Sequence, residues 1–454
     1  MNDERMGTKK VLPLLIEFSI PAIIGMLVNA IYNIVDRMFI GNAPGLGALG
    51  LAGITISFPV TLVLMALSLG AGVGGGTRFS ISLGAGEREE AKKYLGNSFM
   101  LSVFFGLIIM IFGNLFMNQI LTLLGSSEAV LPYAAEYLSI ILYGAVFQCI
   151  AMWGNNLSRA QGNPRNAMVS QLIGAGFNII FDYILIFEFN MGMAGAAWAT
   201  IGGQMLSAIW QLAFIMSDRS IIKLTMDCLK VKAHYIIKII TTGLPVFFMQ
   251  LANSVLNIVL NGTLASYGGD IAISTVGVVT SFQTILLMPL TGLCQGQQSL
   301  VSYNFGAEKM QRVKETLKYS VIGATVFAGV GFLCVQFVPT LIISLFSQDA
   351  EIMKLGTTAI RIWFMLVFLV GAQLVCANYF QAIGKIKEAS LLNLIRQVIV
   401  LIPLIIIFAN LFGLYGIFFA VPAADFVAFV VTMIAIKREF KREQQNTDNI
   451  EPMS

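Results

Sequence analysis

Charged residues are scarce in this chain of 454 residues: Asp, Glu, Lys and Arg together make up 11%, whereas 57% is hydrophobic. A soluble chain of this size cannot hide so much apolar surface in one core. The composition therefore excludes a soluble globular protein and indicates an integral membrane protein. The net charge of +4 comes from basic residues scattered over short loops, so we expect no nucleic-acid partner.

Histidine and cysteine are also rare. The one histidine, His234, lies in a polar stretch, and four of the five cysteines fall in apolar runs. This excludes a disulfide framework and a Cys-based metal site. An intramembrane enzyme would need an apolar run carrying a histidine, a nucleophile with its base, or a cluster of metal ligands, and none is present. We therefore expect neither catalysis nor a cofactor.

Long apolar stretches recur along nearly the whole chain. Each is close to the roughly 20 residues that cross about 30 Å of hydrocarbon, and we predict about twelve transmembrane helices. The predicted spans are 14–38, 48–73, 94–117, 131–157, 166–188, 193–216, 235–260, 271–297, 316–338, 353–380, 389–409 and 414–436. The first lacks a small-residue cleavage signature, so we expect it to remain as a span.

The basic residues fall on alternate connections between these spans. Only Arg37, Lys354 and Arg361 break this pattern. By the positive-inside rule, both termini are expected in the cytoplasm, and the protein in the cytoplasmic membrane.

The second half of the chain repeats the first. "LGAGEREEAKKYLG" from Leu83 reappears as "FGAEKMQRVKETLK" from Phe305, and "FSIPAIIGMLVNAIYNIV" from Phe18 reappears as "TGLPVFFMQLANSVLNIV" from Thr242. The offset stays near 222 residues, so one six-helix unit is present twice. Six is an even number, so the two copies enter the membrane in the same orientation, as a parallel repeat.

We therefore predict an all-α membrane protein with two pseudo-symmetric six-helix lobes around a central cleft. The predicted parts are an N-terminal lobe (1–218), a cytoplasmic linker (219–234), a C-terminal lobe (235–436) and a cytoplasmic tail (437–454). Two related lobes that face one another are typical of an alternating-access transporter.

Four polar residues stand out in the N-terminal lobe: Asp36, Asn178, Asp182 and Thr200. An ionised Asp near the centre of a membrane helix costs about 2.5–3.5 kcal/mol on insertion scales. The repeat has no equivalent acids, because Asp36 aligns with Leu260 and Asp182 with about Pro403. The fold therefore does not require these groups, which points to a function of the N-terminal lobe.

Counting the helical rise places these four residues in the outer half of the membrane, where one pocket can hold them. Two buried carboxyl groups share a proton readily. Carboxylate, amide and hydroxyl oxygens also suit a hard cation such as Na⁺. The sequence leaves H⁺ and Na⁺ open.

Several motifs together resemble the multidrug and toxic compound extrusion (MATE) family, in its bacterial DinF-like branch. They are "NAIYNIVDRMFIG", "RAQGNPRNAM", "FNIIFDYILIF" with "MGMAGAAWAT", and "GLCQGQQSLVSYNFGA". The resemblance covers essentially the whole chain. It implies a V-shaped exporter that exchanges amphipathic, often cationic compounds against inward H⁺ or Na⁺, and it implies that Asp36, Asn178, Asp182 and Thr200 form the cation site.

Other polar and apolar residues have weaker assignments. Asn29 and Asn33 share one helix face with Asp36 and are expected to support it. Arg396 and Asp425 are expected to form a buried structural pair, with a second proton or substrate site as the alternative. Three adaptable apolar residues are candidates for the substrate cleft: Met249, Phe282 and Met288.

Two other transporter classes compete with this interpretation. A lipid-linked oligosaccharide flippase of the related superfamily would need a basic cleft, yet the charges inside the spans are mostly acidic. A major-facilitator transporter usually has an Asp-Arg-rich turn where this chain has "GAGEREEAKK". We expect a monomer whose partners are the lipid bilayer and small amphipathic molecules.

Overall fold

The computed structural model describes residues 5–43, 46–347 and 349–448, and these residues are almost entirely helical. The first half contains α1 (Arg5–Thr8), α2 (Val11–Asn42), α3 (Gly47–Gly84), α4 (Arg88–Leu115), α5 (Met117–Leu123), α6 (Leu131–Tyr143), α7 (Ala145–Ala160), α8 (Pro164–Tyr183), the π-helix η1 (Ile184–Glu188) and α9 (Gly192–Met216). The short 3₁₀ helix η2 (Met226–Leu229) follows in the connection. The second half contains α10 (Ala233–Gly306), α11 (Met310–Phe337), α12 (Pro339–Ser344), α13 (Ala350–Trp363), α14 (Val367–Ala382), α15 (Ile386–Leu394), the π-helix η3 (Ile395–Val400) and α16 (Leu401–Asp448).

These helices provide the predicted number of membrane spans. By length and composition, eight described helices can cross a membrane, and two bent pairs raise the number to ten. The α10 and α16 helices each contain a break, at Gly269 and Gly413, where φ is 59° and 62°. Glycine tolerates this left-handed geometry. Each break divides one long helix into two spans, so the described chain has twelve, and the predicted fold class is confirmed.

The spans differ from the prediction in length and in straightness. The second predicted span, 48–73, lies in a helix that continues to Gly84, and the last continues past 436 to Asp448. The fourth and tenth spans are bent by 52° and 50° between their two helices. Hydropathy does not reveal such bends, because apolar residues continue through them.

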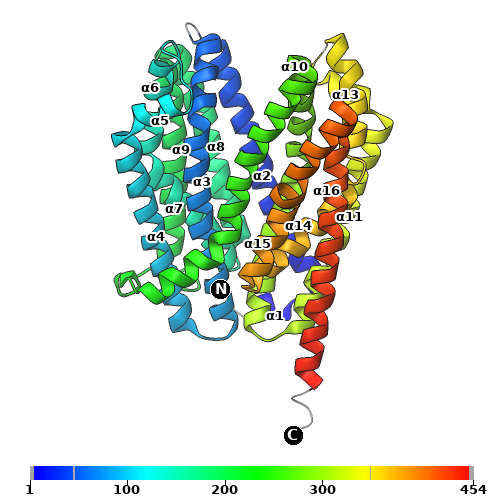
Figure 1. Cartoon of the computed structure of the whole chain (residues 1–454). Coiled ribbons are helices and arrows are strands. Elements are labelled where there is room, and N and C mark those ends of the chain that lie inside the picture. Colours follow the sequence, from blue (N-terminus) through cyan, green and yellow to red (C-terminus); the bar gives the residue numbers. More distant parts are fainter. Residues whose placement is uncertain (1–4, 44–45, 348, 449–454) are drawn as a thin grey trace.

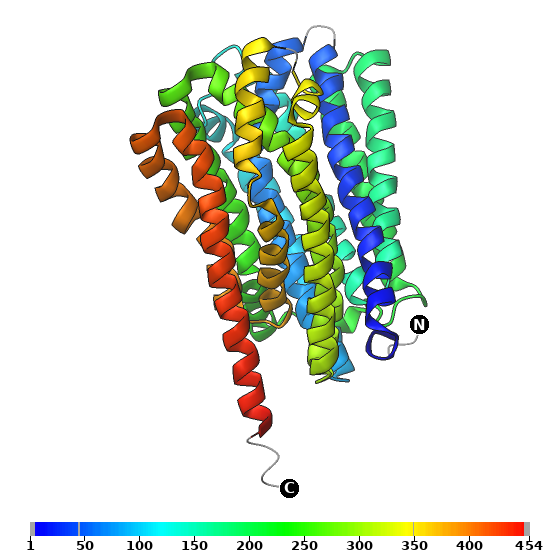
Figure 2. The same ribbon diagram turned by 90° about the vertical axis from the view of Figure 1, so that its right-hand side faces the viewer.

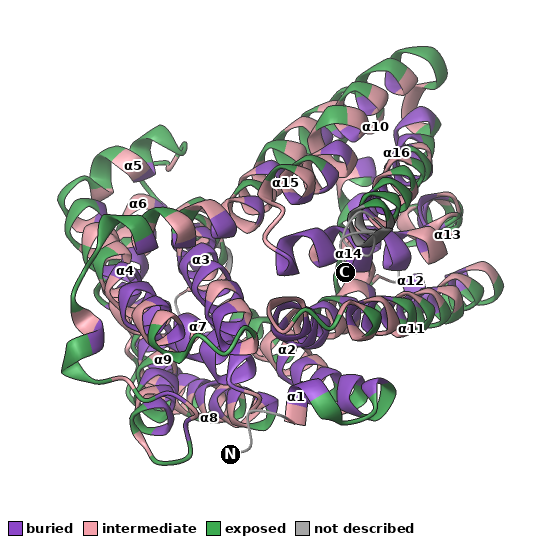
Figure 3. Cartoon of the chain, turned by 90° about the horizontal axis from the view of Figure 1, so that it is seen from below, coloured by how far each residue is buried: buried purple, intermediate pink, exposed green. Residues whose placement is uncertain are grey.

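The helices form two bundles that lie side by side (Figure 1). The bundle containing α2–α9 is called the N lobe here, and the bundle containing α10–α16 the C lobe. The α2 helix lies on the side of the N lobe that faces the C lobe, as Figure 3 shows from below. The end at which α2 begins and α16 ends is called the lower end (Figures 1 and 2). The short helices α5 and α12 begin 222 residues apart, at Met117 and Pro339, in agreement with the repeat.

The two lobes meet closely in their lower halves. A Cβ atom on Gly84 would lie 1.9 Å from the carbonyl oxygen of Tyr303, and one on Gly306 would lie 1.9 Å from that of Ile81. Each residue of the first contact lies 222 positions from its equivalent in the second, so the two contacts are related by the pseudo-symmetry. Glycine is required at both places because two backbones touch there.

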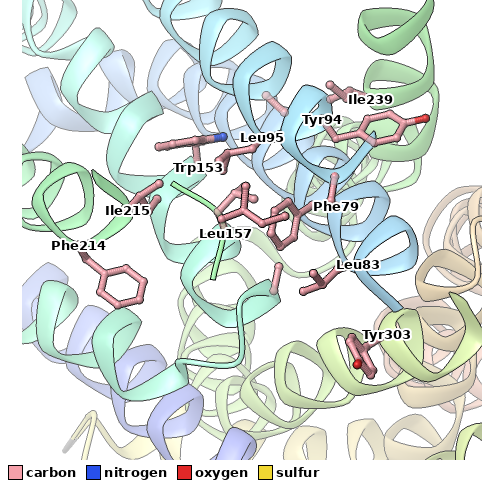
Figure 4. Close-up of a cluster of buried hydrophobic side chains, with 14 of the residues drawn as sticks. Phe79, Leu83, Tyr94, Leu95, Trp153, Leu157, Phe214, Ile215, Ile239 and Tyr303 are labelled. Atoms are coloured by element: carbon pink, nitrogen blue, oxygen red, sulfur yellow. The ribbon is translucent and has the colours of Figure 1, made fainter. Parts of the chain in front are cut away.

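A hydrophobic cluster surrounds this contact and draws side chains from both lobes. Figure 4 shows Phe79 and Leu83 of α3 in the same region as Ile239 and Tyr303 of α10. In the upper half of α10, by contrast, a Cβ atom on Gly262 or Gly277 would meet no described atom within 4 Å. The lobes are therefore joined at the lower end.

Candidate functional site

The candidate site begins with α8, which carries two of the four predicted residues. The side chain of Asn163 caps this helix by accepting from the backbone N–H of Asn166 at 3.2 Å, and Pro164 occupies its first turn. Asn178 and Asp182 then lie one turn apart, exposed by only 3% and 0%. The π-helix η1 begins two residues after Asp182, and π-helical turns often occur at functional sites.

Asp36 of α2 brings a second carboxyl group to Asp182. The two carboxyl groups lie close enough to interact electrostatically, and Asp36 is buried as well. Two ionised carboxylates are both acceptors, so a hydrogen bond between them needs one proton. In the described part of the chain, no N–H or O–H group donates to either oxygen of Asp182. Both oxygens are therefore available to a proton or a cation.

Thr200 of α9 completes the group. The Asn178 amide, close to Asp182, donates from Nδ2 to the Thr200 hydroxyl at 3.3 Å, while Asn178 Oδ1 has no described donor. A tight α8–α9 contact fixes this geometry. A Cβ atom on Gly203 would lie 2.4 Å from the carbonyl oxygen of Gly174, so the two backbones approach closely.

The structure thus brings together the four residues that the sequence singled out, which we call the acidic cluster: Asp36, Asn178, Asp182 and Thr200. Oxygen atoms without donors in a buried cluster with two carboxyl groups suit a hard cation or a shared proton. Val400, the C-lobe residue 222 positions after Asn178, packs against an apolar core instead. The C lobe therefore has no amide oxygen at this position.

Two tyrosines lie next to the cluster and were not predicted from the sequence. Tyr32 and Tyr137 both lie close enough to Asp36 and Asp182 to interact with them electrostatically. Tyr32 lies four residues before Asp36, so helical spacing could have indicated it. Tyr137 comes from α6, and no local pattern links it to the cluster.

The two asparagines predicted to support the cluster lie below it on α2. Asn29 donates to Gln171 of α8 at 3.5 Å, which joins two helices of the site. Asn33 is exposed and donates to the carbonyl oxygen of Asn29 at 2.6 Å. The structure does not bring Asn33 into the acidic cluster, and the supporting role of both residues stays a prediction.

The three candidate cleft residues lie on α10. Phe282 packs edge-on against Phe364, with ring centroids 5.5 Å apart, at the border of the C-lobe core. Met249 and Met288 are half-buried. Their contact with a transported molecule stays a prediction.

Arg396 and Asp425 form an ion pair in the C lobe. Arg396 Nε donates to Asp425 Oδ1 at 2.8 Å, and their side chains are exposed by 12% and 5%. Arg396 belongs to η3 and Asp425 to α16, so the pair ties neighbouring spans together. The structural role of this pair stays a prediction, with a second proton or substrate site as the alternative.

Comparisons with known proteins agree with this architecture. The MatE family model matches residues 21–184 and again residues 245–407, once in each half of the chain. The multidrug export protein MepA of Staphylococcus aureus strain MSSA476 is 28% identical over 442 residues, which cover 96% of each chain. The MepA protein of Staphylococcus saprophyticus is 28% identical over 425 residues, covering 93% of this chain and 92% of that one.

Solved structures give the same fold. An outward-facing MATE family transporter of the MOP superfamily has a TM-score of 0.92 at 22% identity, covering 98% of this chain and 99% of its own. A MOP superfamily transporter from Pyrococcus furiosus has a TM-score of 0.89 at 22% identity, covering 96% and 98%. Because the family model matches both lobes, the chain belongs to the MatE family of membrane transporters.

Proposed function

We propose that this chain exports amphipathic, often cationic compounds across the cytoplasmic membrane in exchange for inward H⁺ or Na⁺. Membership of the MatE family and two MepA relatives named multidrug export proteins support this function. The single observation that carries the coupling mechanism is the acidic cluster, in which two buried carboxyl groups lie close together. A binding cation or proton would offset the cost of burying them.

The distribution of basic residues supports an orientation for the exporter. Basic residues gather in the connections at the lower end, among them Lys92, Lys232 and Lys309, so we place this end and both termini in the cytoplasm. The lobes meet at this end, and the described conformation would therefore open to the outside. Because one chain carries both lobes and the cluster, we propose that it acts as a monomer.

The α2 helix provides a route from the cluster to the other lobe. Its upper part carries Asp36, and its lower part packs on α10, where a Cβ on Gly292 would lie 2.7 Å from Ile23. Pro21 lies inside α2 and has no N–H, so the carbonyl of Glu17 lacks its usual helical donor and the helix can bend there. We propose that cation occupancy changes the packing or bending of α2, and that this change shifts the balance between outward-open and inward-open states.

Transport in proteoliposomes tests this function. The probe is ethidium, an amphipathic cation, with the pH gradient and the Na⁺ gradient imposed separately. We expect the unmodified protein to move the dye with one gradient and Asp182→Asn to lose ion-driven transport. Asp270→Asn is the matched control, because Asp270 is an exposed carboxylate on α10. Full activity of Asp182→Asn would refute the assignment.

A further inference from the structure

A polar cavity lies between the lobes, near the lower end and away from the acidic cluster. Its volume is about 10 Å³, which is room for one water molecule or one small ion, and it is lined by residues of three helices. Thr77 and Ser80 come from α3, Arg159 comes from α7, and Gln295 and Gln298 come from α10. The export function proposed above assigns no role to this cavity.

Arg159 is the only charged residue that lines this cavity in the described chain. It is exposed by only 4%, its Nη2 donates to Asn156 Oδ1 at 3.1 Å, and its Nη1 has no described acceptor. The ion pairs found among the described residues do not include Arg159. A buried guanidinium with no anionic partner is costly, and the C-terminal carbonyls of α7 offset only part of that cost.

The cavity walls offer hydrogen-bond donors and no carboxylate. The Thr77 hydroxyl accepts from Gln298 Nε2 at 2.8 Å, so its own proton is available to another acceptor. Gln295 Oε1 has no donor, and its Nε2 makes only a 3.5 Å contact with the Met26 sulfur. Rotating this amide by 180° would cost little and would place Nε2 where the unpaired Oε1 now lies.

We propose that this cavity binds a small monovalent anion, chloride, between Arg159 of the N lobe and the polar residues of α10. A water molecule would satisfy the free N–H group of Arg159 but would leave its charge unbalanced. Chloride would accept from the guanidinium and from the neighbouring hydroxyl and amide groups, and would also neutralise the charge. The cavity excludes larger organic anions by its size.

The position of the site between the lobes gives it a conformational consequence, which rests on the export function proposed above. Chloride would contact both lobes only while the lower end is closed. Separation of the lobes there would remove Gln295 and Gln298 from the site and expose Arg159 to water. Bound chloride would therefore favour the state that is closed toward the cytoplasm.

Thermal unfolding of the purified full chain tests the site independently of transport. Chloride replaces gluconate at constant ionic strength, and the unfolding midpoint is followed by tryptophan fluorescence. We expect a saturable rise of the midpoint with chloride and no rise for Arg159→Gln. Arg165→Gln, which alters an exposed arginine in the first turn of α8, should show an unchanged rise. An equal response in chloride and gluconate, or a rise retained by Arg159→Gln, would overturn the proposal.

Two further measurements keep the test decisive if Arg159→Gln does not fold. Crystals of the unmodified protein grown in bromide should give an anomalous peak next to Arg159 Nη1, whereas density for a water molecule alone would overturn the site. Asp182→Asn should keep the chloride response while losing ion-driven transport. The export function and the anion site can thus fail separately.

Discussion

The hydrogen bond between Asn178 and Thr200 orients two side chains of the acidic cluster. The Thr200 hydroxyl accepts from the Asn178 amide at 3.3 Å. This contact turns the amide so that Asn178 Oδ1, which has no described donor, remains available. The amide and the hydroxyl therefore position oxygen atoms around the two carboxyl groups.

Replacing Thr200 by valine keeps the shape of the side chain and removes the hydroxyl. One hydrogen bond contributes about 0.5–1.5 kcal/mol, so the driving-ion concentration for half-maximal transport should rise about 2- to 13-fold. Ethidium transport at graded ion concentrations gives this value. Thr357→Val is the control, because Thr357 bonds only its own helix at 2.7 Å from Met353 O. An unchanged half-maximal concentration in Thr200→Val would exclude Thr200 from the cation site.

The buried ion pair between Arg396 and Asp425 is expected to stabilise the folded protein. Removing one partner of a buried ion pair costs about 3–5 kcal/mol, because it leaves an uncompensated charge. Asp425→Arg alone should therefore sharply lower the yield of folded protein, and the exchange Arg396→Asp with Asp425→Arg should recover part of it. Size-exclusion profiles from membranes measure this yield. If the double exchange does not raise the yield of folded protein, a purely structural role for this ion pair would be contradicted.

At the scale of helices, the closure of the lower end depends on backbone contacts that only glycine allows. Gly84 and Gly306 hold α3 and α10 together through two equivalent contacts. The N-terminal segment adds to this closure, because Arg312 Nη2 donates to the backbone carbonyls of Met6 at 3.1 Å and Lys9 at 2.6 Å. Both features favour the conformation in which the lower end is shut.

Gly84→Ala should therefore move the protein toward the state that is open at the lower end. The new Cβ would lie 1.9 Å from a backbone oxygen, and overpacking of this kind costs about 1–3 kcal/mol, or roughly 5- to 150-fold in the ratio of two states. Distances between spin labels on the two lobes measure this ratio. Gly329→Ala is the control, since a Cβ there meets nothing within 4 Å. An unaltered distance distribution in Gly84→Ala would contradict the assigned closure.

The Arg312 contacts predict a milder effect at the same end. Arg312→Ala removes the two hydrogen bonds to the N-terminal segment. A buried hydrogen bond from a charged donor contributes about 1.5–3 kcal/mol, and these two contribute less because they are partly exposed to solvent. Proteolysis of the N-terminal segment should become faster in this variant. Equal proteolysis rates with and without Arg312 would show that the contacts do not hold the segment.

At the scale of the whole molecule, the sequence predicts the two lobes because a repeat and twelve apolar runs are local, additive patterns. It also predicts the acidic cluster, since symmetry shows which polar residues the fold does not need. It does not predict the approach of Tyr137 to Asp36, or of Arg159 to Gln295, because packing between distant spans decides these contacts. The bends at the fourth and tenth spans and the π-helical segments have no hydropathy signal either.

The proposed coupling requires the acidic cluster to hold the ion that substrate displaces. Addition of ethidium to weakly buffered, detergent-solubilised protein, with parallel measurement of released H⁺ and released radioactive Na⁺, tests it most directly. We expect release of one of these ions from the unmodified protein. The double variant Asp36→Asn with Asp182→Asn should release neither ion while it still binds the dye. Equal release from the unmodified and the doubly substituted protein would show that the cluster does not hold the displaced ion.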